Sequence, residues 1–321
     1  MALANFPNGI TSFGIPVIGG WGYPLRVPGI VSGVLGKVYF VDRDTGNDGS
    51  DGLSPDKAFA TIQRAINLAV SGRGDQILVQ NSQSDYAENL VIDKNDISII
   101  GESASADRVS VAPLAGAPLI NNIGHRLVLA NLQLRSKDAG VVAGCTQRAN
   151  RYRFVNCDFN SDHGPGLRLL PGNTDSSDHY TASEGIIEQC LFRYCSTNGL
   201  TFENPGVGGG GFGGVGTTGV VVRGCAFSGN ANEDIKDVDT GGSNDKCFGS
   251  DGGDENLITD CRFLSRNKAI YITLTNGGSN TGLISNSFFA EDVSLTAVKI
   301  ALASAIVFAG NYDAVGIVNG S

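Results

Sequence analysis

A six-residue pattern that recurs along the middle of the chain constrains the fold more than any other feature. Its five copies are FVNCDF, IEQCLF, VRGCAF, ITDCRF and ISNSFF, which end at Phe159, Phe192, Phe227, Phe263 and Phe289. The cysteine position recurs after 33, 35 and 36 residues, and the last copy, 26 residues further on, has Ser287 there. A fixed pattern joined by connections of variable length is typical of a solenoid, in which equivalent units stack along one axis.

The cysteine and the phenylalanine of each copy lie two positions apart, so on a strand both side chains point to the same side. We expect them to line the interior as a ladder of small and large apolar side chains. A second apolar alternation follows each copy, for example Leu167 with Leu169, and gives each unit two strands separated by a turn. The predicted core ladder consists of Cys157, Phe159, Cys190, Phe192, Cys225, Phe227, Cys261, Phe263 and Phe289.

Weaker copies extend the pattern in both directions, as ISIIG, LANLQL and VFAGNY. With the five strong copies they predict about eight coils, which at about 4.8 Å per coil form a rod on the order of 40 Å long. Glycine accounts for 45 of the 321 residues, which suits a fold with many strands and many tight turns.

The segment that precedes these copies predicts a helix at the start of the coil. Ser54 is a residue type that commonly caps helices, and Pro55 suits the first helical position. A short amphipathic helix near residues 55–70 would cover the open end of the coil, whose core and strand edges would otherwise be exposed. Its apolar stripe consists of Ala58, Ile62, Ala65, Ile66 and Ala69.

Charge, cysteine usage and hydropathy restrict the partners. The net charge of −9 argues against a nucleic-acid partner, which would require clustered basic residues. None of the seven cysteines forms a CxxC pair, so we expect structural, reduced thiols with no metal and no cofactor. The start, MALANFPNGI, lacks the features of a signal peptide, and no apolar run reaches the roughly 20 residues of a membrane helix. We therefore expect assembly in a cytoplasm and no membrane partner.

The run DTGNDGSDGLSPDKAFATIQRAI, followed by GDQILV, YAENLVI and ISIIG, resembles the opening segment of pectin-lyase-like right-handed parallel β-helix proteins. With the repeated pattern, the resemblance covers roughly residues 38 to 312. It implies an all-β fold in which residues 37–321 form one β-helix domain with the capping helix. It implies little about activity, because this superfamily includes lyases, hydrolases, epimerases and inert spikes.

Residues 1–36 form a separate apolar element, rich in proline and glycine, that can neither form a long helix nor stay comfortably in water. Its opening, NFPNGITSFGIPVIG, resembles the start of bacteriophage virion structural proteins. We expect an extended arm that docks onto other virion proteins or a neighbouring subunit; the alternative is a strap along its own coil. The residues expected to dock are Phe6, Phe13, Ile15, Val17, Trp21 and Tyr23.

The two resemblances imply a virion structural protein, either a head decoration or fibre or a small tailspike, that forms a homotrimer in the host cytoplasm. Three insertions, at about residues 170–185, 203–219 and 239–256, follow the second strand of successive units. Insertions at equivalent points of a solenoid stack on one side, so we expect them to form one ridge. This ridge is where we expect adhesion to the host surface, with a surface glycan as the candidate ligand.

The alternative function is a tailspike polysaccharide depolymerase, a glycan hydrolase or lyase on the same fold. A hydrolase needs two carboxylates about 5 to 9 Å apart, one of which stays protonated. The spacing of the three histidines supports no Ser-His-Asp arrangement. The sequence thus favours a binding protein over an enzyme and assigns no catalytic residue, although adjacent coils offer carboxylates at Asp158, Asp162, Asp175, Asp178, Glu184 and Glu188.

Overall fold

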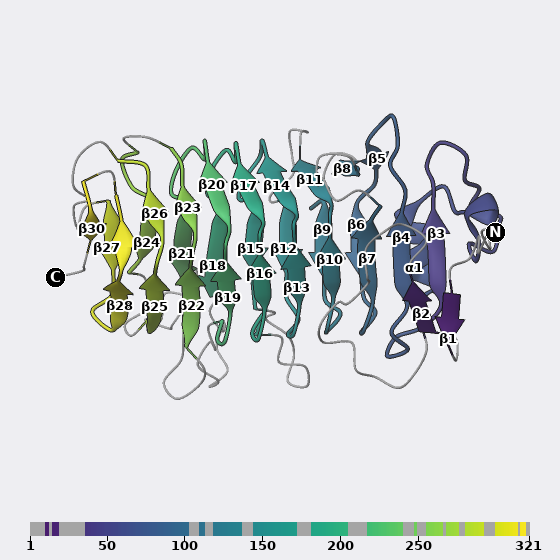
Figure 1. Ribbon diagram of the computed structural model, residues 1–321, viewed down its shortest axis with the longest axis horizontal. Coiled ribbons are helices and arrows are strands. Elements are labelled where there is room, and N and C mark those ends of the chain that lie inside the picture. The colour runs from purple at the N-terminus through teal and green to yellow at the C-terminus, as the bar shows by residue number, and fades with distance from the viewer. Residues whose placement is uncertain are drawn as a thin grey trace, which may run out of the picture.

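The computed structural model is a right-handed parallel β-helix, in which strands of successive coils stack in register into three long sheets (Figure 1). Two sheets have ten strands and the third has eight. Most of the core is one continuous apolar column enclosed by these sheets. The structure describes residues 10–12, 15–18, 36–102, 109–112, 118–136, 144–171, 181–204, 217–239, 247–248, 255–265, 268–275, 280–291, 299–313 and 315–318.

Each full coil contributes one strand to each sheet. Sheet 1 comprises β3 (Val38–Val41), β4 (Gln76–Val79), β7 (Ser98–Gly101), β10 (Val128–Ala130), β13 (Arg153–Val155), β16 (Ile186–Glu188), β19 (Val221–Arg223), β22 (Asn256–Thr259), β25 (Gly282–Ser285) and β28 (Ile306–Ala309). Sheet 2 comprises β5 (Tyr86–Ala87), β8 (Ser110–Ala112), β11 (Gln133–Ser136), β14 (Asp158–Ser161), β17 (Leu191–Arg193), β20 (Ala226–Ser228), β23 (Arg262–Phe263), β26 (Phe288–Phe289), β29 (Asn311–Tyr312) and the antiparallel β30 (Ile317–Val318). Sheet 3 comprises β6 (Leu90–Ile92), β9 (Ile120–Asn122), β12 (Cys145–Gln147), β15 (Leu167–Leu169), β18 (Leu200–Asn204), β21 (Ile235–Asp239), β24 (Ile272–Leu274) and β27 (Ile300–Leu302).

The repeated six-residue pattern bends around the corner between sheets 1 and 2. In FVNCDF, Phe154 lies in β13 and Phe159 in β14, and the intervening Asn156 has a φ of 49°. Each coil therefore has three strands, one more than the two expected from the sequence. The residue before the cysteine position adopts this left-handed conformation in successive coils, with φ between 49° and 64° at Asn131, Asn156, Gln189, Gly224, Asp260, Asn286 and Gly310. Asparagine, aspartate and glycine tolerate that conformation better than other residues do.

The phenylalanines of the pattern form a stack through the interior. The Phe192 ring lies 4.9 Å from Phe159 and 4.8 Å from Phe227, centroid to centroid, with interplanar angles of 7° in both pairs. The stack continues from Phe227 to Phe263 at 5.0 Å and on to Phe289 at 4.5 Å. The neighbouring cysteines at 157, 190, 225 and 261 are at most 2% exposed. Burial of each phenylalanine stabilises the coil by about 1.5 to 3 kcal/mol relative to an exposed side chain.

A helix packs at the N-terminal end of the coil, but it begins later than the sequence predicted. Pro55–Lys57 is only a 3-10 turn (η1), and the Ser54 side chain makes no capping hydrogen bond. The α-helix α1 spans Ile62–Leu68, with Thr61 accepting a hydrogen bond from the Arg64 amide at 3.3 Å. Glu88 then accepts the amides of the first two helical residues at 2.9 and 2.8 Å. These acceptors satisfy helix N–H groups that Ser54 could not reach, so the helix starts there.

The buried face of α1 contacts β3 and β4 of sheet 1 and β6 of sheet 3, at the N-terminal end of the coil (Figure 1). Among the described residues, no helix is long and apolar enough to cross a membrane.

The described part of the arm is a short antiparallel hairpin, formed by β1 (Ile10–Ser12) and β2 (Ile15–Ile18). These two strands form their own sheet and pair with no strand of the coil that the structure describes. Ile15 and Val17 lie in β2, of which only the backbone is described, and the other predicted docking residues, Phe6, Phe13, Trp21 and Tyr23, lie outside the described residues. Docking through residues 1–36 stays a prediction.

Candidate functional site

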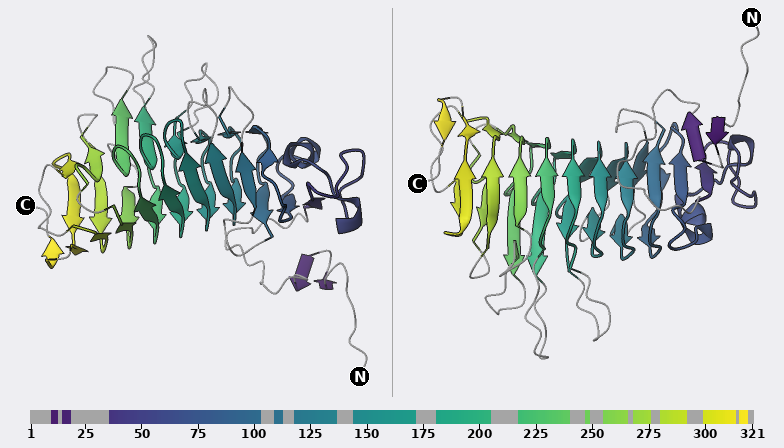
Figure 2. Two further views of the ribbon diagram at one scale, coloured as in Figure 1. Left: turned by 90° about the horizontal axis from the view of Figure 1, so that it is seen from above. Right: turned by 60° about the horizontal axis from the view of Figure 1, so that its bottom comes forward.

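The candidate site lies on the outward face of sheet 3, beside the edge from which the predicted insertions depart. Segments 172–180, 205–216 and 240–246 follow β15, β18 and β21 and lie outside the described residues. These three strands are hydrogen-bonded neighbours in register, so their C-terminal ends lie side by side (Figure 2). The three departure points therefore share one edge of one sheet, while the ridge predicted from the insertions themselves lies outside the described residues.

Arg168 of β15 and Glu203 of β18 form a two-point ion pair across this face. The guanidinium donates to the two carboxylate oxygens at 2.7 and 2.5 Å, and the Thr201 hydroxyl lies 3.0 Å from the same carboxylate. Glu203 is only 4% exposed although it points away from the core. The hydrogen-bonded carboxylate raises the pKa of Arg168, so the guanidinium stays charged across the neutral range.

Glu233, which precedes β21, accepts the next group of hydrogen bonds on this face. Its carboxylate accepts from the Lys236 ammonium at 3.0 Å and from the Asn198 amide at 2.8 Å. Thr273 of β24 reaches the same carboxylate at 3.4 Å. Burial opposes the charge of Glu233, but Lys236 and the other donors outweigh it and lower the pKa of this carboxyl below its usual value. Hydrogen bonds from four consecutive coils thus fix the face in one arrangement.

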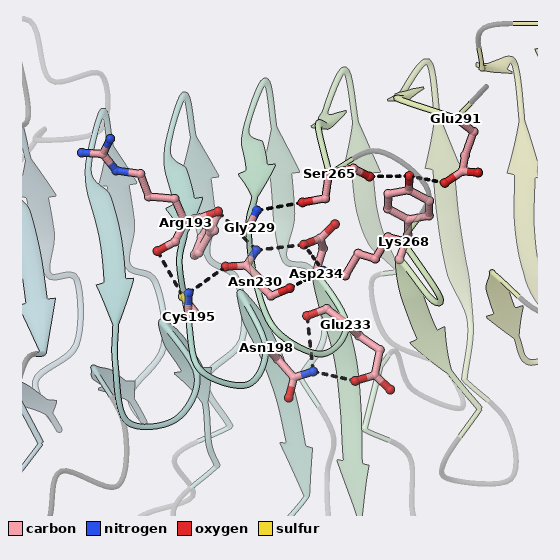
Figure 3. Close-up of polar contacts among 12 residues, drawn as sticks. Arg193, Cys195, Asn198, Gly229, Asn230, Glu233, Asp234, Ser265, Lys268 and Glu291 are labelled. Atoms are coloured by element: carbon pink, nitrogen blue, oxygen red, sulfur yellow. Dashed lines mark hydrogen bonds and ion pairs between the residues drawn. The ribbon is translucent and has the colours of Figure 1, made fainter. Parts of the chain in front are cut away.

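A second polar network lies beneath, at the corner between sheets 2 and 3 (Figure 3). Asp234 is fully buried, and its carboxylate accepts from the Lys268 ammonium at 2.7 Å and from the Asn230 amide at 2.8 Å. Lys268 also donates to the Asn230 carbonyl at 3.0 Å. Burial raises the pKa of Asp234, and the attraction of Lys268 offsets only part of that effect. A buried pair of this kind fixes geometry more than it adds stability.

The corner network extends toward the C-terminal end through Tyr271. Its hydroxyl lies 2.5 Å from a Glu291 carboxylate oxygen and 2.6 Å from the Ser265 carbonyl (Figure 3). Glu291, which is fully buried, also pairs with Lys299. Ser265 in turn accepts the Gly229 amide at 2.7 Å. Polar groups therefore tie successive coils together behind the candidate face.

This network was not predicted from the sequence, although the sequence carries a signal for it. Cys195, Asn230 and Ser265 recur at intervals of 35 residues, and so do Asn198, Glu233 and Lys268. That interval is the length of one coil in this part of the chain, so residues so spaced lie on neighbouring coils. The pattern was hidden because its members are chemically different, unlike the repeated cysteines and phenylalanines.

The carboxylates that the sequence offers on adjacent coils, without assigning them a catalytic role, lie elsewhere, and three of the four that the structure describes pair with arginine. Asp158, on the outward face of sheet 2, accepts from Arg193 at 3.1 and 2.5 Å and from Gln133 at 3.1 Å. Asp162 is exposed, and Asp175 and Asp178 lie outside the described residues. Glu184 pairs with Arg151 at 2.6 Å, and Glu188 pairs with two arginines, Arg153 at 2.9 Å and Arg223 at 2.5 Å.

The described face of sheet 3 offers hydrogen-bond donors and acceptors in fixed positions. Fixed charged groups and amides of this kind recognise the hydroxyl groups of sugars. Hydrolysis of a glycan needs one carboxyl that stays protonated near a second carboxylate. Glu203 and Glu233 are instead paired with cations. Within the described ranges, no group of three or more His, Cys, Asp or Glu side chains is arranged to hold a metal ion.

Comparisons with known proteins place the fold but not the function. No protein-family model matches the chain, and no curated protein matches it. Among solved structures, a pectin methylesterase in complex with a hexasaccharide has a TM-score of 0.53 at 13% identity, covering 88% of this chain and 90% of that one. The YbhC protein of Escherichia coli has a TM-score of 0.52 at 12% identity, covering 98% and 87%.

The pectate lyase Pel9A has a TM-score of 0.51 at 11% identity, covering 90% of this chain and 79% of that one. Likeness at such low identity concerns the fold alone. The resemblance read from the sequence is confirmed at that level: the chain has the pectin-lyase-like right-handed parallel β-helix fold.

Proposed function

We propose that this chain is a bacteriophage virion structural protein, a head decoration, a fibre or a small tailspike, which binds a host-surface glycan along the outward face of sheet 3. Residues 1–36 dock it onto other virion proteins, and no cofactor takes part. The chain acts on the virion after assembly in the host cytoplasm.

The observation that carries glycan binding is the position of the charge-paired face at the shared edge of β15, β18 and β21. Three insertions leave this edge from neighbouring coils, spaced about 4.8 Å apart as in any sheet. Arg168, Glu203, Glu233 and Lys236 supply fixed polar groups beside them. A long, rigid row of polar groups suits an extended polysaccharide, and pairing of the carboxylates with cations favours binding over cleavage.

The virion assignment is supported by the arm. Its opening sequence resembles those of phage virion structural proteins, and its apolar composition favours a protein partner. The described hairpin of β1 and β2 pairs with no described strand of the coil, which leaves it available to a partner.

The test is to incubate the full chain with purified host capsule or lipopolysaccharide and to measure binding together with new reducing ends or unsaturated sugars. We expect binding without release of oligosaccharide. Lys236→Gln should weaken binding at least several-fold, because Lys236 is a half-buried cation on the face. The control Arg223→Gln removes an exposed cation from sheet 1 and should leave binding unchanged. Failure to bind any glycan of the host, or equal effects of the two variants, would contradict the proposal.

A depolymerase on the same fold is the second candidate, and one arrangement favours it. Asp158 is buried and held in position by Arg193 and Gln133 on adjacent strands of sheet 2, which suits a positioned nucleophile, although its pairing with Arg193 does not suit the protonated acid of a hydrolase. If the incubation releases oligosaccharide, Asp158→Asn should abolish the release while Glu203→Gln leaves it intact. Release would replace the adhesion proposal with this one.

A further inference from the structure

The outward face of sheet 1 differs from the other two outward faces because it is dominated by apolar side chains. In the C-terminal half, one outward position is aliphatic in five consecutive strands that are in register. The residues are Ile186, Val221, Leu257, Leu283 and Val307. The core of these strands is formed by the alternate residues, such as Val222 and Ile258, so the aliphatic row is not part of the interior.

In the N-terminal half, the apolar row continues at the other outward position of the strand. Phe40, Leu78, Ile100, Ala130 and Val155 are in register there, on β3 to β13. The two rows meet where Arg153, Glu188 and Arg223 form ion pairs with one another at 2.9 and 2.5 Å. At this crossing Glu188 is paired with both arginines, which leaves one net positive charge between the two apolar rows.

The other outward faces are charged in the same coils. Sheet 3 presents Arg168, Lys236 and Glu203, and sheet 2 presents Arg193 and Arg262. Together the two rows place an apolar residue on the outward side of each of the ten strands, and exposed apolar patches of a few hundred Å² mark interaction surfaces. We propose that the outward face of sheet 1 is the surface through which copies of this chain associate.

The dimensions of the face fit association between copies. Ten strands at about 4.8 Å extend for on the order of 45 Å, and an outward width of about 12 Å gives roughly 500 Å² from the strands alone. A stable interface buries about 800 Å² on each partner, so the strands supply more than half of the area and the adjoining corners can supply the rest. Flat apolar sheets also pack well face to face, at about 10 Å between their backbones.

A second copy is a better occupant than the chain's own arm. The described hairpin of the arm folds back on itself, and in both views of Figure 2 it lies at the N-terminal end of the coil. The aliphatic row from Ile186 to Val307 lies in the C-terminal half. The proposal is independent of glycan binding, because it uses a different sheet.

The test compares two outward-facing apolar residues of the same coil on different faces. Leu283 lies on sheet 1, and Phe288 lies five residues later on sheet 2, with 40% of its surface exposed. Sedimentation should give the parent chain a mass of at least twice the 33.3 kDa of one copy. Leu283→Glu should weaken association at least tenfold with an unchanged circular dichroism spectrum, and the control Phe288→Glu should associate as the parent does.

A cross-linking variant keeps the proposal testable if Leu283→Glu folds poorly. All seven natural cysteines are buried, so Leu257→Cys introduces the one readily accessible thiol. A short bismaleimide should then join copies through Leu257→Cys but not through the control Phe288→Cys. A monomeric parent chain, dissociation by Phe288→Glu instead, or cross-linking of the control alone would overturn the proposal.

Discussion

Removal of one ring from the phenylalanine stack tests whether the stack holds the coils together. Phe227 is fully buried, and its ring lies 4.8 Å from Phe192 and 5.0 Å from Phe263 with nearly parallel planes. Phe→Ala substitutions in cores cost about 3 to 5 kcal/mol, and aromatic contacts contribute about 0.5 to 1.5 kcal/mol each within that range. Because Phe227 has rings on both sides, we expect Phe227→Ala to lower the free energy of unfolding by about 4 to 5 kcal/mol.

Guanidinium denaturation followed by far-ultraviolet circular dichroism measures this change, as a lower midpoint with an unchanged denaturant dependence. The control is Phe288→Ala, the same substitution at an exposed position of sheet 2, which should cost less than about 1 kcal/mol. A loss of unfolding free energy below about 2 kcal/mol for Phe227→Ala, or equal losses for both variants, would refute the claim that the phenylalanine stack stabilises the fold.

Three other outcomes follow from the ion pairs and the thiols. Arg168→Ala should lower the free energy of unfolding by about 3 to 5 kcal/mol in the same denaturation assay, because it leaves the buried Glu203 carboxylate without its cation; a neutral result would contradict this. Burial opposes the charge of Glu188, but Arg223 and Arg153 outweigh burial and lower the pKa of this carboxyl below its ordinary value of 4.5. Its stabilisation is therefore present above that pH and is lost on acidification, so the stability gap between Glu188→Gln and the parent should close as the pH falls; a gap that widens would be the contrary result. Burial raises the pKa of the Cys190 thiol, so a thiol reagent such as dithiobisnitrobenzoate should label almost no cysteine in the folded chain and all seven after unfolding; rapid labelling of the folded chain would show that the ladder is open to solvent.

The repeated cysteine and phenylalanine pattern sufficed to predict the architecture, because burial at those two positions is what each coil requires. The eight copies recognised in the sequence correspond to eight of the ten strands of sheet 1, from β7 to β28. The two strands without a copy, β3 and β4, belong to the opening segment, where α1 interrupts the regular coil.

The repeated pattern did not reveal the backbone turns within a coil or the buried polar contacts between coils. An alternation of apolar residues looks the same on one strand as on two strands joined at a corner, so the left-handed residue at Asn156 could not be recognised from one copy. Asp237 illustrates a second limit: it occupies an inward position beside Phe202 and is fully buried. It is accepted there because the Asn280 amide donates to its carboxylate at 2.7 Å, a contact across 43 residues that no local spacing reveals.

The outward face of sheet 3 was not predicted; the sequence analysis placed adhesion on the ridge of insertions. The position of the insertions indicated only that they leave one edge of the coil, because equivalent connections of a solenoid stack. The pairing of Arg168 with Glu203 depends on the register between β15 and β18, which in turn depends on how many residues the preceding connection contains. Which charges meet across coils is therefore a property of the folded stack.

The proposed virion role is tested most directly by asking whether the chain is part of a phage particle. Mass spectrometry and electron cryomicroscopy of purified particles from the phage that encodes it should find the chain in many copies. We expect rods on the order of 45 Å long, attached at the end that carries residues 1–36. Particles that lack the chain, while it is abundant in the lysate of infected cells, would contradict a virion role.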